Sequence, residues 1–122
     1  MKRLKKSFEN AFSGFSWAVK TQPNFKFHFF LAIVSLLGGI ILKISYEEFL
    51  IILVFIFIGL VIEMLNTAIE KTNDAIDTSW REDIKLAKDL SAGAMLVFSF
   101  GAFLTAIIIF GPKICKLLGF LI

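Results

Sequence analysis

Three long uncharged stretches constrain this chain more than any other feature of its sequence. They follow the basic N-terminal segment and occupy residues 27–42, 49–62 and 90–112. A helix needs about 20 mostly apolar residues to cross the hydrocarbon core of a bilayer, and flanking lysines extend a slightly shorter run. We expect the last span to end near Gly111–Pro112, a dipeptide that stops helices. The pattern predicts transmembrane helices at about 25–44, 47–70 and 88–111.

The composition excludes the main alternatives to a membrane protein. Hydrophobic residues make up 57% of the 122 residues and charged residues 19%, with a mean hydropathy of +0.82. Soluble domains are nearer half apolar and a quarter charged, and a chain this short has little interior in which to bury the excess. We therefore expect one all-α integral membrane domain over residues 1–122, neither multidomain nor disordered.

The cysteine and histidine content limits the possible metal chemistry. The chain has one cysteine, Cys115, and one histidine, His28. A disulfide within the chain and a zinc site built from cysteine and histidine are thereby excluded. A metal would have to be held by oxygen atoms, which suits magnesium, manganese or calcium. His28 and the tryptophans are interpreted as residues of the bilayer interface.

The N-terminal segment has the pattern of an amphipathic helix. Its large apolar residues recur at helical spacing, while lysines and other polar residues occupy the opposite face. Residues 1–22 are too polar to span a bilayer, so we expect an interfacial helix that ends before Pro23. The alternative is an ordinary helix packed against the others.

The distribution of cations predicts the orientation in the membrane. Six of the 13 lysines and arginines lie in the first 26 residues, and four more lie between residues 71 and 88. The positive-inside rule therefore puts the N-terminus and the 71–87 segment in the cytoplasm. This asymmetry also accounts for the net charge of +3 without a nucleic-acid partner.

A stripe of oxygen-bearing side chains follows the second apolar run. At 100° per residue, five of them share an arc of about 80° on one helix face: Glu63, Asn66, Glu70, Asp74 and Asp77. Glu63 follows 14 uncharged residues, and a carboxylate at that depth costs about 2.5–3.5 kcal/mol, which indicates a functional role. For Asp74 and Asp77, a solvated helix end is an equally good interpretation.

Cations lie close to this stripe in the sequence. Arg81, Lys85 and Lys88 precede or open the third span. Carboxylates that bind Mg²⁺, beside cations that neutralise phosphates, are typical of phosphoryl-transfer sites. The chain has neither GxxxxGK[ST] nor GxGxxG, so a nucleotide would bind without a glycine-rich loop.

These residues resemble the prokaryotic diacylglycerol kinase family, which includes the undecaprenol kinases of Gram-positive bacteria. The family signature E-x-L-N-[ST]-A-I-E-x-x-x-D is matched by residues 63–74, and A-K-D by residues 87–89. Residues 24–28 (NFKFH) are similar to the family's N-x-R-I-H run. The resemblance covers roughly residues 3–110.

The resemblance implies a membrane lipid kinase of the bacterial cytoplasmic membrane. Family members have an amphipathic surface helix and three transmembrane helices, and they form homotrimers. ATP·Mg²⁺ enters from the cytoplasm, and the hydroxyl of a lipid alcohol enters from the bilayer. The Asn66–Thr67 form and the 24–28 run are nearer the Gram-positive members, which favours undecaprenol over diacylglycerol as the acceptor.

Residue roles follow from the same resemblance. Glu63 would be the general base, Asn66 would orient the reacting groups, and Glu70 would coordinate Mg²⁺ with the ATP phosphates. The remaining nucleotide contacts would be Asp74, Lys88, Asp89 and Arg3.

The sequence also departs from the family pattern. Gln22 stands where many members carry a glutamate that is a second metal ligand, and a neutral glutamine is a poorer ligand for Mg²⁺. Lys26 replaces an arginine and keeps the charge without the bidentate fork. Two other classes of protein stay open from the residues alone. These are a small transporter with an embedded functional glutamate and a non-catalytic membrane scaffold.

Overall fold

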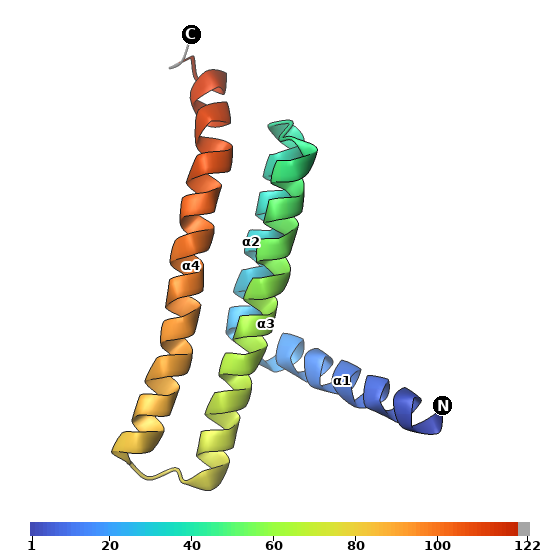
Figure 1. Ribbon diagram of the computed structural model, residues 1–122, viewed down its shortest axis with the longest axis vertical. Coiled ribbons are helices and arrows are strands. Elements are labelled where there is room, and N and C mark those ends of the chain that lie inside the picture. Colours follow the sequence, from blue (N-terminus) through green and yellow to red (C-terminus); the bar gives the residue numbers. More distant parts are fainter. Residues whose placement is uncertain (120–122) are drawn as a thin grey trace.

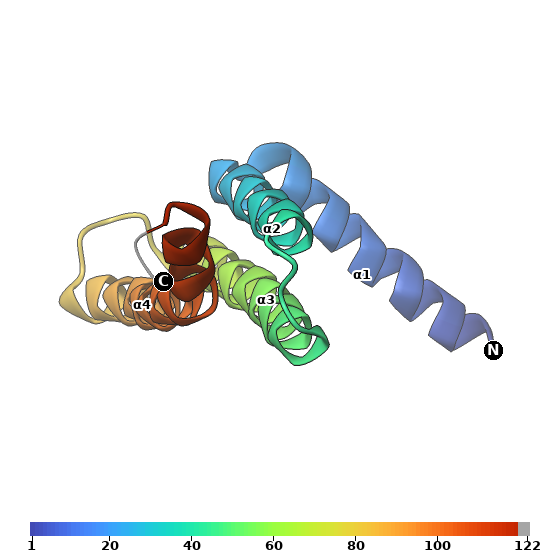
Figure 2. The same ribbon diagram turned by 90° about the horizontal axis from the view of Figure 1, so that it is seen from above.

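A computed structural model describes residues 1–119, which form four helices and no strand (Figure 1). The helices are α1 (Lys2–Thr21), α2 (Pro23–Ile41), α3 (Tyr46–Ile76) and α4 (Glu82–Leu117). The last three are long and apolar enough to cross a membrane, as the sequence predicts. They run alongside one another, whereas α1 leaves sideways from the lower end of α2, and α3 and α4 continue below that point. Seen from above, α3 lies between α4 and the α1–α2 pair (Figure 2).

The breaks between the first three helices have clear causes in the sequence. Gln22 is extended, with φ −95° and ψ 117°, because the following Pro23 disfavours the helical region, and Pro23 itself starts α2. A capping box begins α3. The backbone amide of Glu48 donates to Ser45 Oγ at 3.2 Å, and that of Ser45 donates to Glu48 Oε2 at 2.7 Å.

Helices α3 and α4 extend beyond the spans predicted at 47–70 and 88–111. The expected stop at Gly111–Pro112 is wrong, because α4 continues through Pro112 to Leu117. Proline lacks a backbone N–H and its ring crowds the carbonyl four residues earlier, which disfavours a helix interior without excluding it. Near this point Lys113 Nζ donates to the carbonyl oxygen of Ile109, one turn back, at 3.2 Å. At the opposite end, the segment expected to separate the spans over 71–87 is mostly helical, leaving residues 77–81 as the connection.

Few apolar residues are buried within a single chain. The buried apolar residues are Ala18, Phe25, Ala32, Ile52, Ile84 and Ile109. Most other large apolar side chains are exposed, which fits surfaces that face lipid or other membrane-embedded protein. The fully buried Phe25 meets Phe15 edge to face, with ring centroids 6.3 Å apart, and so joins α1 to α2. The interfacial position of α1 and the homotrimer stay predictions.

Candidate active site

Glu63 lies at one end of an elongated cleft formed by α2, α3 and α4. The cleft has a volume of about 560 Å³, and the residue is only 2% exposed. Two of the described residues that line it are ionisable, Glu63 and His28. Their Oε2 and Nε2 atoms are 3.9 Å apart. The expected interfacial histidine is therefore turned inward, toward the carboxylate that the sequence singled out.

The rest of this cleft is mostly apolar. Phenylalanines line much of it, together with aliphatic residues and a few hydroxyl groups. Along α4 its wall runs from Met95 to Phe110, which is about 22 Å at 1.5 Å per residue. The cleft thus combines a long hydrocarbon-lined channel with a carboxylate at one end.

Asn66 lies one turn beyond Glu63 on α3 and is also buried, with 8% of its surface exposed. Ser91 of α4 donates a hydrogen bond to Asn66 Oδ1 at 2.7 Å. On its other side, Asn66 Nδ2 donates to Glu70 Oε1 at 3.3 Å. The two bonds connect α4 to the next carboxylate of the stripe.

The outer part of the stripe meets a cation from α4. Lys88 Nζ donates to Asp74 Oδ1 at 2.5 Å, across 14 residues of sequence. Both side chains are partly exposed, so solvent reaches this end of the site. Glu70, which lies between Asn66 and Asp74 on the same face, is exposed as well.

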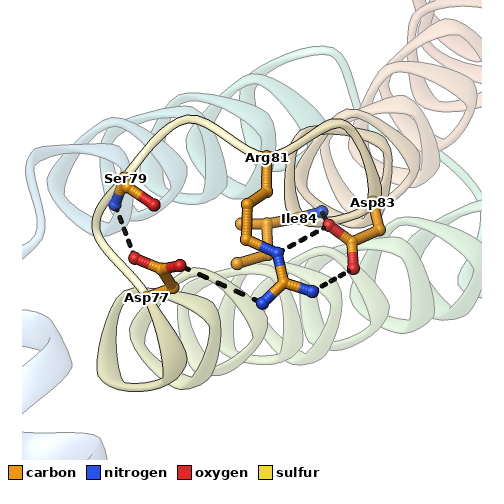
Figure 3. Close-up of polar contacts among 5 residues, drawn as sticks. All are labelled: Asp77, Ser79, Arg81, Asp83 and Ile84. Atoms are coloured by element: carbon orange, nitrogen blue, oxygen red, sulfur yellow. Dashed lines mark hydrogen bonds and ion pairs between the residues drawn. The ribbon is translucent and has the colours of Figure 1, made fainter.

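The charged side chains at the connection from α3 to α4 pair with one another (Figure 3). Arg81 forms an ion pair with Asp83 at 2.6 Å and a longer one with Asp77 at 3.9 Å. The side chain of Asp77 also accepts a hydrogen bond from the backbone amide of Ser79 at 2.8 Å, and this bond is the largest cause of the lowered pKa of Asp77. Lys85 is paired with Asp89. Lys88 is therefore the cation through which α4 reaches the stripe.

Three residues that the sequence placed at the site lie apart from the stripe in one chain. Asp89 pairs along α4 with Lys85 at 2.6 Å. Arg3 is exposed in the first turn of α1. The N-terminal end of this helix points away from the other three helices (Figure 1). Gln22 donates to Thr21 Oγ1 at 3.0 Å, at the junction of α1 and α2.

The donor set suits a metal ion that is shared with a phosphate ligand. In the described part of the chain, no three residues among histidines, cysteines and carboxylates come together as a metal site. Glu70 nevertheless offers an exposed carboxylate beside the Asp74–Lys88 pair. Proteins commonly hold Mg²⁺ by one or two carboxylates together with phosphate oxygens and water, and this arrangement fits that pattern.

Two residues of the site did not emerge from the sequence. Ser91 follows the A-K-D motif and there looked like one of several small residues. Its position two residues beyond Asp89 gives no sign that its hydroxyl crosses to Asn66. His28 carried a signal, because it closes the NFKFH run at 24–28, but its distance from Glu63 in the sequence hid their contact.

Comparison with known proteins agrees on one family. The family described as "Prokaryotic diacylglycerol kinase" matches residues 9–110. The chain is 37% identical to an undecaprenol kinase of Bacillus subtilis over 114 residues, which is 93% of each chain. It is 29% identical to a diacylglycerol kinase of Synechocystis over 113 residues, which is 92% of this chain and 65% of that relative.

Proposed function

The chain belongs to the prokaryotic diacylglycerol kinase family and is a lipid kinase, and from this premise we propose that it transfers the γ-phosphoryl group of ATP to a membrane lipid alcohol. The proposal includes Mg²⁺ as the metal that accompanies ATP. It also includes the bacterial cytoplasmic membrane as the location, a cytoplasmic N-terminus and a homotrimeric assembly.

One observation carries the acceptor side of this proposal. Glu63 is the only carboxylate that lines the cleft among the described residues, and apolar side chains form most of the remaining wall. A lipid alcohol has a matching shape, with a long hydrocarbon tail and one reactive polar end. The tail would lie along the wall from Met95 to Phe110, and the hydroxyl would meet Glu63.

The donor side follows the stripe away from the cleft. Asn66, Glu70 and Asp74 lie on successive turns of α3, and Glu70 is about 10 Å beyond Glu63 along the helix axis. In the proposal, Lys88 turns from Asp74 to the phosphates and neutralises part of their charge. Mg²⁺ would add charge neutralisation at the phosphates when it is held beside Glu70. The roles of Asp89 and Arg3 at the nucleotide, and of Gln22 at a second metal, rest on the resemblance.

The reaction needs one proton acceptor and no covalent enzyme intermediate. The lipid oxygen forms a bond to the γ-phosphorus, while the bond from that phosphorus to the β–γ bridging oxygen breaks and releases ADP. The hydroxyl proton passes to the carboxylate of Glu63. Positioning and charge neutralisation supply most of the catalysis in such transfers, and the rigid stripe on α3 is suited to both.

We propose undecaprenol as the preferred acceptor. The similarity to the undecaprenol kinase of Bacillus subtilis extends over 93% of both chains, and diacylglycerol is the alternative acceptor. The two lipids differ in tail and headgroup, so a direct comparison separates them.

The test uses the purified protein in detergent with ATP and each lipid. We expect phosphate transfer that requires Mg²⁺ and is faster with undecaprenol. Glu63→Gln preserves the size of the side chain and should lower kcat by about 100-fold or more, because it removes the base. Transfer to neither lipid, or an unchanged rate in Glu63→Gln, would contradict the proposal.

A further inference from the structure

The structure places a second ionisable group beside the proposed base. His28 Nε2 is 3.9 Å from Glu63 Oε2, and the two side chains are 17% and 3% exposed. No other described residue that lines the cleft can ionise. An imidazole in such an apolar channel loses favourable contact with water, so packing alone gives a poor reason for its presence.

The imidazole packs against α3 at a glycine, where no side chain separates the ring from the helix backbone. Gly59 lies one turn before Glu63, on the same face of the helix. A Cβ atom at this glycine would lie 3.6 Å from His28 Nδ1, so the ring packs directly against the α3 backbone. The same Cβ would come within 2.8 Å of the Phe98 ring on α4. With its Nδ1 edge against Gly59, the imidazole presents Nε2 toward the carboxylate.

The separation of the two side chains suits a bridging hydroxyl group. Hydrogen bonds between such groups are about 2.8 Å long. An oxygen atom at that distance from both Nε2 and Oε2 makes an angle of about 90° between them, given their separation of 3.9 Å. A hydroxyl group there has one hydrogen to donate to the carboxylate and lone pairs to accept from the imidazole.

We propose that His28 is a catalytic residue that binds the acceptor hydroxyl together with Glu63. His28 donates a hydrogen bond from its Nε2–H group to the lipid oxygen. It transfers no proton during the reaction. The hydroxyl hydrogen points at Glu63, which takes it as the oxygen attacks the γ-phosphorus. Two contacts fix the direction of the O–H bond, whereas one would leave it free to rotate. This inference rests on the proposed lipid kinase function.

The single histidine allows this contact to be observed without turnover. Protein labelled with ¹⁵N-histidine gives signals from one imidazole, because the chain has one histidine. The labelled protein would be titrated, without ATP, with undecaprenol or 1,2-dioleoylglycerol, whichever the wild type phosphorylates faster. The matched control is the deoxy form of the same lipid, in which hydrogen replaces the hydroxyl group and no oxygen is left to accept from His28. We expect the alcohol to move the imidazole nitrogen signals and the deoxy lipid to leave them unchanged or nearly so.

Kinetics of two variants complete the test. His28→Leu removes the donor at similar size, and we expect kcat/KM for the lipid to fall about 10- to 100-fold while KM for ATP changes less than twofold. His28→Gln keeps an N–H donor on a side chain of similar reach and should recover part of the loss, which a purely structural role would not predict.

The outcomes separate this inference from the function on which it rests. If the wild type phosphorylates lipid but its imidazole nitrogen signals do not move when the alcohol is added, the role of His28 is wrong and the proposed function stands. Full activity in His28→Leu would lead to the same conclusion. A wild type that phosphorylates no lipid would overturn the proposed function, and this inference with it. The titration uses the wild-type protein, so it decides the point even if His28→Leu does not fold.

Discussion

Ser91 of α4 fixes the orientation of the Asn66 amide on α3. Its hydroxyl lies 2.7 Å from Asn66 Oδ1 and 2.9 Å from the carbonyl oxygen of Lys88, which share its one hydrogen, and both Ser91 and Asn66 are buried. Because the oxygen side of the amide is occupied, its Nδ2 faces Glu70, whose Oε1 is 3.3 Å away. The α3–α4 interface therefore sets the geometry of the stripe through one hydrogen bond.

Ser91→Ala should lower kcat by about 3- to 30-fold, because the amide of Asn66 is then free to rotate away from Glu70. Removing a buried hydrogen bond should also lower the free energy of unfolding by about 1 kcal/mol. Steady-state kinetics and thermal unfolding in detergent measure the two effects. Ser7→Ala on the exposed face of α1 is the control and should change neither. An active Ser91→Ala protein with wild-type kcat would contradict the orienting role.

The sequence predicts the helices well because each depends on local signals. Long apolar runs, Pro23 and the serine that caps α3 are all readable along the chain. The stop at Gly111–Pro112 failed because α4 stays helical past the proline, which the dipeptide alone does not reveal. The same distinction applies to the site. Helical spacing places Glu63, Asn66, Glu70 and Asp74 on one face, whereas Ser91 and His28 join them only through packing between helices.

Lys88 and Asp74 should affect the nucleotide more than the fold. Their 2.5 Å contact is partly exposed, and pairs of this kind contribute little to stability. We expect Lys88→Met to raise KM for ATP about tenfold, because one phosphate-neutralising cation is lost, and to leave KM for the lipid nearly unchanged. Lys88→Arg keeps the charge and serves as the matched control. A change in lipid KM alone would contradict the placement of Lys88 at the phosphates.

The connection between α3 and α4 should loosen in acid. The hydrogen bond from the Ser79 amide holds the pKa of Asp77 below its usual value, so its carboxylate stabilises the fold above the unfolded-state pKa of about 3.9. That contribution is lost as the pH falls through the lower, folded-state pKa. We expect faster hydrogen exchange at the Ser79 amide as the pH falls from about 5 to 3, beyond the change in intrinsic rate. Asp77→Asn should flatten this dependence, and an equal dependence in both proteins would contradict it.

The ion pair at the opposite end of the helices should affect stability without affecting catalysis. Lys113 Nζ lies 2.6 Å from Glu48 Oε1 and joins α4 to the start of α3. Glu48 precedes Glu63 by 15 residues on the same helix, which is about 22 Å along its axis. Lys113→Met keeps the length of the side chain and leaves the capping box of Ser45 and Glu48 intact. We expect it to lower the Tm in detergent by a few degrees, because α4 loses its contact with α3 beyond Pro112. Its kcat at a temperature well below the Tm should match the wild type.

Lys116→Met removes a lysine one turn further along α4 and is the matched control, expected to keep the wild-type Tm. A large loss of kcat in fully folded Lys113→Met would contradict this prediction, because it would mean that the two ends of the bundle are coupled. The distance from the ion pair to Glu63 argues against such coupling.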